Sequence, residues 1–116
     1  AGTELYNEGG IKIVGKTVDE NSFWGTGILL YIENTSGKNV GVQCDNMSIN
    51  GFMTTPYFSC DVYDGKKAIR DITVLSSGLE ENGIESIKDV ELQFHIYDVD
   101  TYTTIADSEP ITFSAQ

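Results

Sequence analysis

The stretch VELQFHIY at residues 90–97 alternates apolar and polar side chains without interruption. Successive side chains of a β-strand point to opposite faces, so a period of two places Val90, Leu92, Phe94 and Ile96 on one face and the polar residues on the other. The stretch therefore predicts a strand that faces a core on one side and water on the other.

Shorter stretches with the same period lie elsewhere in the chain, and residues that favour turns separate them. The apolar alternation recurs at residues 11–13, 28–32, 58–62, 72–74 and 111–113. The dipeptides NG at 50–51, DG at 64–65 and NG at 82–83 readily supply the positive φ of tight turns, and residues 34–39 form a polar loop. This spacing predicts many short antiparallel strands.

Residues 77–83 predict one short helical turn, because Ser77 can cap a helix, Glu80 follows three residues later and Gly83 can end it. Taken together, the patterns predict an all-β fold, an antiparallel immunoglobulin-like β-sandwich of about seven or eight strands. A closed barrel is the alternative. Because no internal repeat or linker interrupts the pattern, we expect residues 1–116 to form a single domain.

One segment changes phase. Apolar residues occupy even positions over 40–44 and odd positions over 47–53. When the apolar pattern of a strand shifts by one residue, its apolar side chains would point to the opposite face. A β-bulge, which inserts one extra residue into the strand, keeps them on the same face. The change near Asp45 and Asn46 therefore predicts a kinked strand with a β-bulge, rather than two separate strands, with Met47, Ile49 and Met53 on its apolar face.

Composition limits the classes of partner. The 116 residues are 40% apolar, which suits one domain with a core that needs no metal or disulfide. A net charge of −11 argues against binding to nucleic acid or to an anionic membrane surface. The longest apolar run, residues 28–32, is too short to span a bilayer, so no direct membrane insertion is expected.

The two cysteines leave two possibilities open. Cys44 and Cys60 both lie in strand-like patterns, and they suit either one disulfide of an exported protein or two buried thiols. They lack the CxxC spacing of a zinc site.

No sequence motif of a known catalytic site occurs, so we expect no enzyme activity and no cofactor. The single histidine, His95, shares its strand face with Glu91, Gln93 and Tyr97. We interpret it as a residue that faces solvent. A Cys–His pair is not expected, because the apolar face of the strand is opposite to His95.

Two groups of residues are candidates for ligand binding. Tyr31, Tyr97 and Tyr102 are candidate sugar-binding residues, because Tyr31 and Tyr97 fall in the phase opposite to the apolar set of their strands. Asp98 and Asp100 are candidate calcium ligands, possible helpers being Asp107 or Glu109, because calcium prefers carboxylate and carbonyl oxygens. The ordinary alternatives are cross-strand packing for the tyrosines and backbone hydrogen bonds for the aspartates.

Several strings resemble a known group of domains: FWG at 23–25, LYIEN at 30–34, CDNMSINGF at 44–52, GKK at 65–67 and FHIYD at 94–98. Over roughly residues 4–114 the chain resembles the uncharacterised immunoglobulin-like domains of exported lipoproteins and surface proteins from anaerobic Gram-positive gut bacteria. The resemblance implies a β-sandwich and an extracellular or cell-surface-anchored location, without an assigned activity.

We therefore expect a non-enzymatic immunoglobulin-like module for adhesion, scaffolding or protein interaction at the bacterial surface, with an unidentified protein or glycan as its partner. The alternative is a carbohydrate-binding module, with or without the assistance of calcium.

Overall fold

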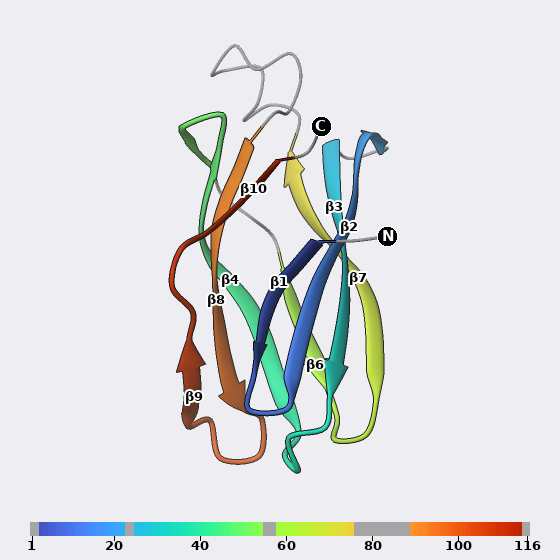
Figure 1. Cartoon of the computed structure of the whole chain (residues 1–116), viewed down its shortest axis with the longest axis vertical. Coiled ribbons are helices and arrows are strands. Elements are labelled where there is room, and N and C mark those ends of the chain that lie inside the picture. Colours follow the sequence, from blue (N-terminus) through green and yellow to red (C-terminus); the bar gives the residue numbers. More distant parts are fainter. Residues whose placement is uncertain (1–2, 23–24, 55–57, 76–88, 115–116) are drawn as a thin grey trace.

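The protein is an all-β sandwich of two antiparallel sheets (Figure 1). The computed structural model describes residues 3–22, 25–54, 58–75 and 89–114, and every regular element in these ranges is a strand. No helix in this part of the chain is long and apolar enough to cross a membrane. The helical turn expected at 77–83 lies outside the described residues.

The first sheet has four strands. They are β1 (Thr3–Glu8), β2 (Ile11–Ser22), β3 (Gly25–Asn34) and β7 (Lys67–Leu75), in the order β1-β2-β3-β7. All pairs are antiparallel. The strand β1 therefore lies at one edge of this sheet, and β7 lies at the other.

The second sheet is built around two long strands, β4 (Val40–Ile49) and β8 (Asp89–Asp98), which pair with each other. On the far side of β4, β5 (Phe52–Thr54) and β6 (Ser59–Val62) pair with its opposite ends. On the far side of β8, β9 (Thr104–Asp107) and β10 (Ile111–Ser114) do the same. The two sheets keep separate edges, which is the arrangement of a sandwich and not of the alternative barrel.

The described residues contain ten strands instead of the expected seven or eight. The additional strands include β5, with 3 residues, and β9, with 4. Segments this short offer too few alternating positions for a period of two to reveal them, and only their pairing with a longer strand defines them.

The core face predicted for residues 90–97 is confirmed by the burial of alternate side chains of β8. Val90, Leu92, Phe94 and Ile96 are at most 1% exposed. They pack with buried residues of the first sheet, which include Ile11, Ile13, Ile28, Leu30, Ile32 and Ile72. Full burial of such a side chain stabilises the folded state by about 1.5–3 kcal/mol.

The predicted kink in residues 40–49 is also confirmed. Cys44 pairs with Phe94 and Asn46 pairs with Gln93, so Asp45 is an extra residue in β4. The bulge restores the apolar phase, because Met47 and Ile49 are buried.

The prediction for Met53 is wrong, because its side chain is 83% exposed. Asn50 and Gly51, with φ of 52° and 86°, form a turn that reverses the chain into β5. In this hairpin Met53 lies opposite Ser48, and cross-strand partners share a face. Ser48 alternates with the buried Met47 and Ile49, so Met53 points outward with it.

Candidate functional site

The outward face of the second sheet carries three rings in a row. The His95 and Tyr97 ring centroids lie 5.7 Å apart with an interplanar angle of 22°. The Tyr97 and Tyr102 centroids lie 6.4 Å apart at 13°. We call these three residues the ring row. Tyr102 is 82% exposed, so the row ends in a ring that is open to solvent.

The turn between β8 and β9 brings Tyr102 to this position. Asp98 donates its backbone N–H to the Thr103 carbonyl at 2.8 Å, and Tyr102 donates its own to the Asp98 carbonyl at 2.7 Å. Tyr102 adopts a φ of 59°, which is uncommon for a residue other than glycine. The closed turn thus folds Tyr102 back towards Tyr97.

The Tyr97 ring lies over the neighbouring strand at Gly41. The two residues are cross-strand partners, and a Cβ at position 41 would fall 2.3 Å from Tyr97 Cζ. A side chain at this position would therefore displace the ring. Because Gly41 has no side chain, the Tyr97 ring can pack directly against the backbone of β4.

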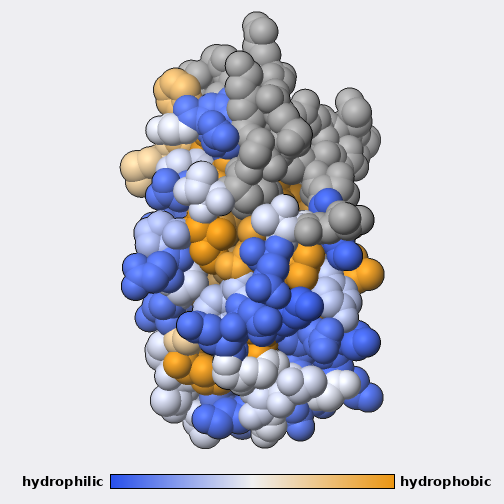
Figure 2. All heavy atoms as spheres, viewed as in Figure 1, coloured by the Kyte–Doolittle hydropathy of each residue, from blue (hydrophilic) through white to orange (hydrophobic). Residues whose placement is uncertain are grey.

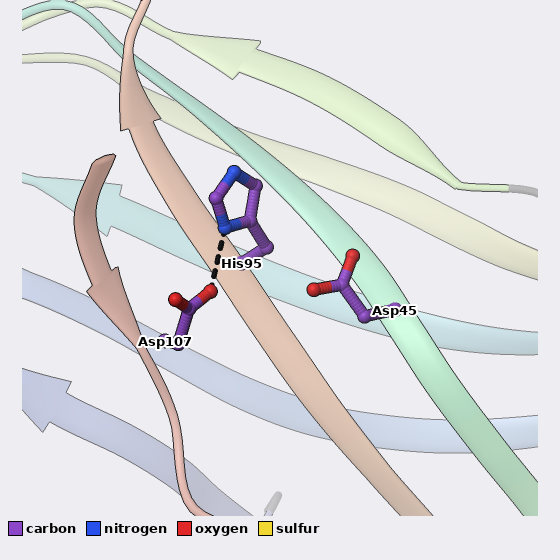
Figure 3. Close-up of side chains that lie close together, drawn as sticks. All are labelled: Asp45, His95 and Asp107. Atoms are coloured by element: carbon purple, nitrogen blue, oxygen red, sulfur yellow. Dashed lines mark hydrogen bonds and ion pairs between the residues drawn. The ribbon is translucent and has the colours of Figure 1, made fainter. Parts of the chain in front are cut away.

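At the end of the ring row opposite Tyr102, His95 lies beside two carboxylates (Figure 3). His95 Nδ1 lies 2.6 Å from Asp107 Oδ1. One donor atom from each of Asp45, His95 and Asp107 lies within 4.8 Å of the others. We call these three residues the carboxylate–histidine cluster. The side chain of His95 is 25% exposed and that of Asp107 is 63% exposed, so the cluster is accessible from solvent.

The sequence prediction treated His95 as a solvent-facing residue and did not connect it with Asp45. The phase change at residues 45–46 was the available signal, because a bulge commonly redirects a side chain. It could not be used without knowing which strand pairs with β4.

Tyr31 does not join Tyr97 and Tyr102. It lies in β3 of the other sheet, between the buried residues Leu30 and Ile32, and faces outward. Its hydroxyl donates to Glu33 Oε2 at 2.8 Å, and this hydrogen bond is the main cause that raises the pKa of Tyr31. Lys16 Nζ lies 5.6 Å from the centre of its ring. Of the three tyrosines predicted to bind sugar, only two therefore share a surface.

Asp98 and Asp100 lie at the turn after β8, where the Asp98 carboxylate contacts the turn itself and the Asp100 carboxylate contacts Asn39 before β4. Asp100 donates its backbone N–H to Asp98 Oδ1 at 2.8 Å. Asn39 Nδ2 donates to Asp100 Oδ2 at 3.5 Å. Calcium binding here stays a prediction. Asp107, considered as a helper, lies instead beside His95.

A cleft of about 480 Å³ lies where the edges of the two sheets approach each other. Residues of β1 and of the segment from β9 to β10 line it, among them the carboxylates of Glu4, Glu8, Asp107 and Glu109. Leu5 and Ile111 add apolar surface. Figure 2 shows apolar atoms exposed between polar ones on this side of the molecule. We call this region the edge cleft.

The cysteines are free thiols that point into the core. Burial raises the pKa of Cys44 to about 12, and burial also raises the pKa of Cys60. Both thiols are therefore protonated at neutral pH, and the thiol form is a poor nucleophile. His95 lies on the opposite face of the sheet, as the sequence predicted.

Comparisons with known proteins add no assignment. No protein-family model, curated protein or solved structure matches the chain.

Proposed function

We propose that this chain is a non-enzymatic binding module with immunoglobulin-like organisation, acting outside the cell or anchored to its surface in adhesion, scaffolding or protein interaction. The order of the strands supports the immunoglobulin-like part. In that fold one sheet contains the first, second and fifth strands side by side, and the other contains the third, sixth and seventh. Here β2-β3-β7 and β4-β8-β10 have corresponding positions.

The edge cleft is the observation that favours a protein partner. Within the described residues, β1 pairs only with β2 and β10 pairs only with β8, so an unpaired strand edge lies on each sheet beside the cleft. An exposed edge can accept an extended segment of another chain through backbone hydrogen bonds. Pockets beside the edge then select alternate side chains of that segment.

The charge of the edge cleft defines the chemistry of this partner. Four carboxylates line it, and the whole chain has a net charge of −11. Two copies of the chain therefore repel each other at this edge, which is one way in which proteins prevent self-association of open strands. A segment that alternates lysine or arginine with apolar residues would satisfy both the carboxylates and the apolar surface of Leu5 and Ile111.

The state of the two cysteine thiols supports the non-enzymatic part of the proposal. The raised pKa of Cys44 and Cys60 keeps both thiols protonated, and both lie on the core side of the second sheet. His95 instead contacts Asp107 on the outer face. This pair contacts neither thiol, so it does not activate one.

Selection of random nine-residue peptides on the immobilised chain tests the protein-binding proposal. We expect the enriched peptides to alternate basic and apolar residues, and their binding to weaken as salt increases. The double variant Glu4→Lys, Glu8→Lys should reduce their affinity at least about tenfold, a change of about 1.4 kcal/mol. The control is Glu33→Lys in β3, which makes the same kind of charge change away from the cleft.

Enrichment of peptides without basic residues would contradict the proposal, as would equal losses in the edge-cleft variant and in the Glu33 control.

Carbohydrate binding is a second candidate, and the ring row favours it. Aromatic rings can cover the apolar face of a sugar, while neighbouring amides and carboxylates bind its hydroxyl groups. Asn46 and Gln93 supply amides on the same face, where Asn46 Nδ2 donates to Gln93 Oε1 at 2.8 Å. Tyr97 and Tyr102 supply the rings.

A glycan array, read with calcium and with a chelator, tests this candidate. Tyr97→Ala and Tyr102→Ala should abolish retention of any bound glycan, whereas Tyr31→Ala, on the opposite sheet, should leave it unchanged. Retention that survives both ring-row substitutions would exclude this surface. Calcium-dependent retention that is lost in Asp98→Asn would support the predicted role of that loop.

A further inference from the structure

We propose that Asp45, His95 and Asp107 bind a divalent transition-metal ion of the zinc class on the outer face of the second sheet. The three residues come from three neighbouring strands, β4, β8 and β9, and their donor atoms lie within 4.8 Å of one another (Figure 3). This site shares Asp107 with the edge cleft and His95 with the ring row, but the proposal rests on the metal-donor atoms of the cluster and on neither of the two proposed functions.

Strand pairing fixes two of the three donors. His95 and Asp107 are cross-strand partners between β8 and β9, and His95 Nδ1 lies 2.6 Å from Asp107 Oδ1. Asp107 therefore orients the imidazole ring. A metal ion bound by both atoms would replace this hydrogen bond, because a metal ligand must be deprotonated.

The β-bulge supplies the third donor. Cys44 pairs with Phe94 and Asn46 pairs with Gln93, so Asp45 is the extra residue of β4, and its carboxylate comes within 4.8 Å of the His95 donor atom. In Figure 3 the Asp45 carboxylate extends from β4 towards the space beside His95 and Asp107. A regular strand would have no additional residue at this place.

Charge balance also favours a cation. Asp45 forms no ion pair within the described part of the chain, while Asp107 faces only the imidazole of His95, which is neutral unless protonated. Two carboxylates beside one histidine therefore leave a local negative charge, and the net charge of −11 adds a long-range attraction for cations. A divalent ion would neutralise the pair of carboxylates.

The type of donor decides which cation is expected. An imidazole nitrogen with two carboxylate oxygens suits zinc, which commonly takes three protein ligands and a water molecule. Calcium prefers six to eight oxygen ligands, and magnesium prefers an octahedral set of oxygens. The cluster therefore differs in kind from Asp98 and Asp100, for which the sequence predicted calcium.

Titration of ZnCl2 into the chain, prepared without a histidine tag, tests the proposal by calorimetry. His95 is the only histidine, so its imidazole ¹⁵N and ¹H resonances report this site without ambiguity. We expect one zinc ion per chain and shifted His95 resonances, with no displacement by equal concentrations of CaCl2 or MgCl2. The thiols do not compete, because both are buried and protonated.

Variants separate this site from other acidic positions. His95→Ala, Asp45→Asn and Asp107→Asn should each weaken zinc binding at least about 10-fold, because even the loss of an outer-shell partner at a metal site weakens binding by about 10- to 100-fold. Asp98→Asn, in the nearby turn, is the matched control and should change affinity less than about twofold. Circular dichroism of each variant checks that the sandwich still forms.

Three results would each overturn the proposal. The first is the absence of heat and of resonance shifts at millimolar zinc. The second is zinc binding that His95→Ala leaves unchanged. The third is zinc binding that Asp98→Asn abolishes while Asp45→Asn and Asp107→Asn do not.

Discussion

Replacing Asn34 with alanine should remove the hydrogen bonds that join the two sheets at the end of β3. Asn34 is fully buried. Its Nδ2 donates to the carbonyls of Lys38 at 2.7 Å and Val62 at 2.8 Å. Its Oδ1 accepts from the backbone N–H of Ser36 at 2.9 Å and from the Ser36 hydroxyl at 2.6 Å. One side chain thus connects β3, the loop that follows it and the end of β6.

The expected cost follows from the burial of these partners. A buried polar group that loses its partner costs about 1–3 kcal/mol. The Val62 carbonyl is buried with its bond, whereas the contacts to Lys38 and Ser36 are partly buried and can recover some hydration. We therefore expect Asn34→Ala to destabilise the domain by about 3–5 kcal/mol. At about 4 °C per kcal/mol for a chain of this length, the melting temperature should fall by about 12–20 °C.

Urea unfolding followed by circular dichroism measures this loss. Thr35→Ala is the control, because Thr35 is the exposed neighbour and its hydroxyl makes a single hydrogen bond, to the Gly10 carbonyl at 3.2 Å. That variant should lose less than about 1 kcal/mol. A loss below about 1 kcal/mol for Asn34→Ala, or one equal to that of Thr35→Ala, would refute the reasoning and mean that water replaces the amide.

Two other predictions concern the second sheet. Burial raises the pKa of Cys44 from 9.0 to about 12, so the folded state favours the protonated thiol; this contribution to stability is complete below pH 9 and is lost as the pH rises towards 12. We therefore expect the free energy of unfolding, measured with urea, to fall from pH 7 to pH 10.5 by less in Cys44→Ala than in the unaltered chain. An equal fall in both proteins would contradict the raised pKa of Cys44. Gly41→Ala should displace the Tyr97 ring, which a Cβ would meet at 2.3 Å, and should destabilise the domain by about 1–3 kcal/mol while changing the near-ultraviolet dichroism of the tyrosines. In a Tyr97→Ala background the same glycine substitution should cost much less, and a cost that persists there would show that the ring is not its cause.

Local sequence patterns predicted much of the sandwich. The alternation at residues 90–97 correctly assigned the core face of β8, because burial on one face and solvation on the other impose a period of two on the strand itself. The phase change at residues 45–46 predicted the bulge, since the buried face must continue on both sides of it. Met53 was assigned wrongly, because its orientation depends on pairing with Ser48 and not on its own strand.

The candidate sites depended much more on tertiary structure. Tyr31 and Tyr97 have the same local pattern, but they lie on different sheets, and no period within a strand tells which sheet a strand joins. Burial of Asn34 likewise follows from the approach of the β6 end to the loop after β3.

The sequence by itself determined the all-β class, the core face of the long strands and the position of the kink, because each of these is a property of neighbouring residues. Only the tertiary structure decided that Asp45, His95 and Asp107 meet, and that β1 and β10 enclose a cleft between two open edges. The physical reason is that strand register and sheet order are set by hydrogen bonds between distant segments, and a single strand contains no record of its partners.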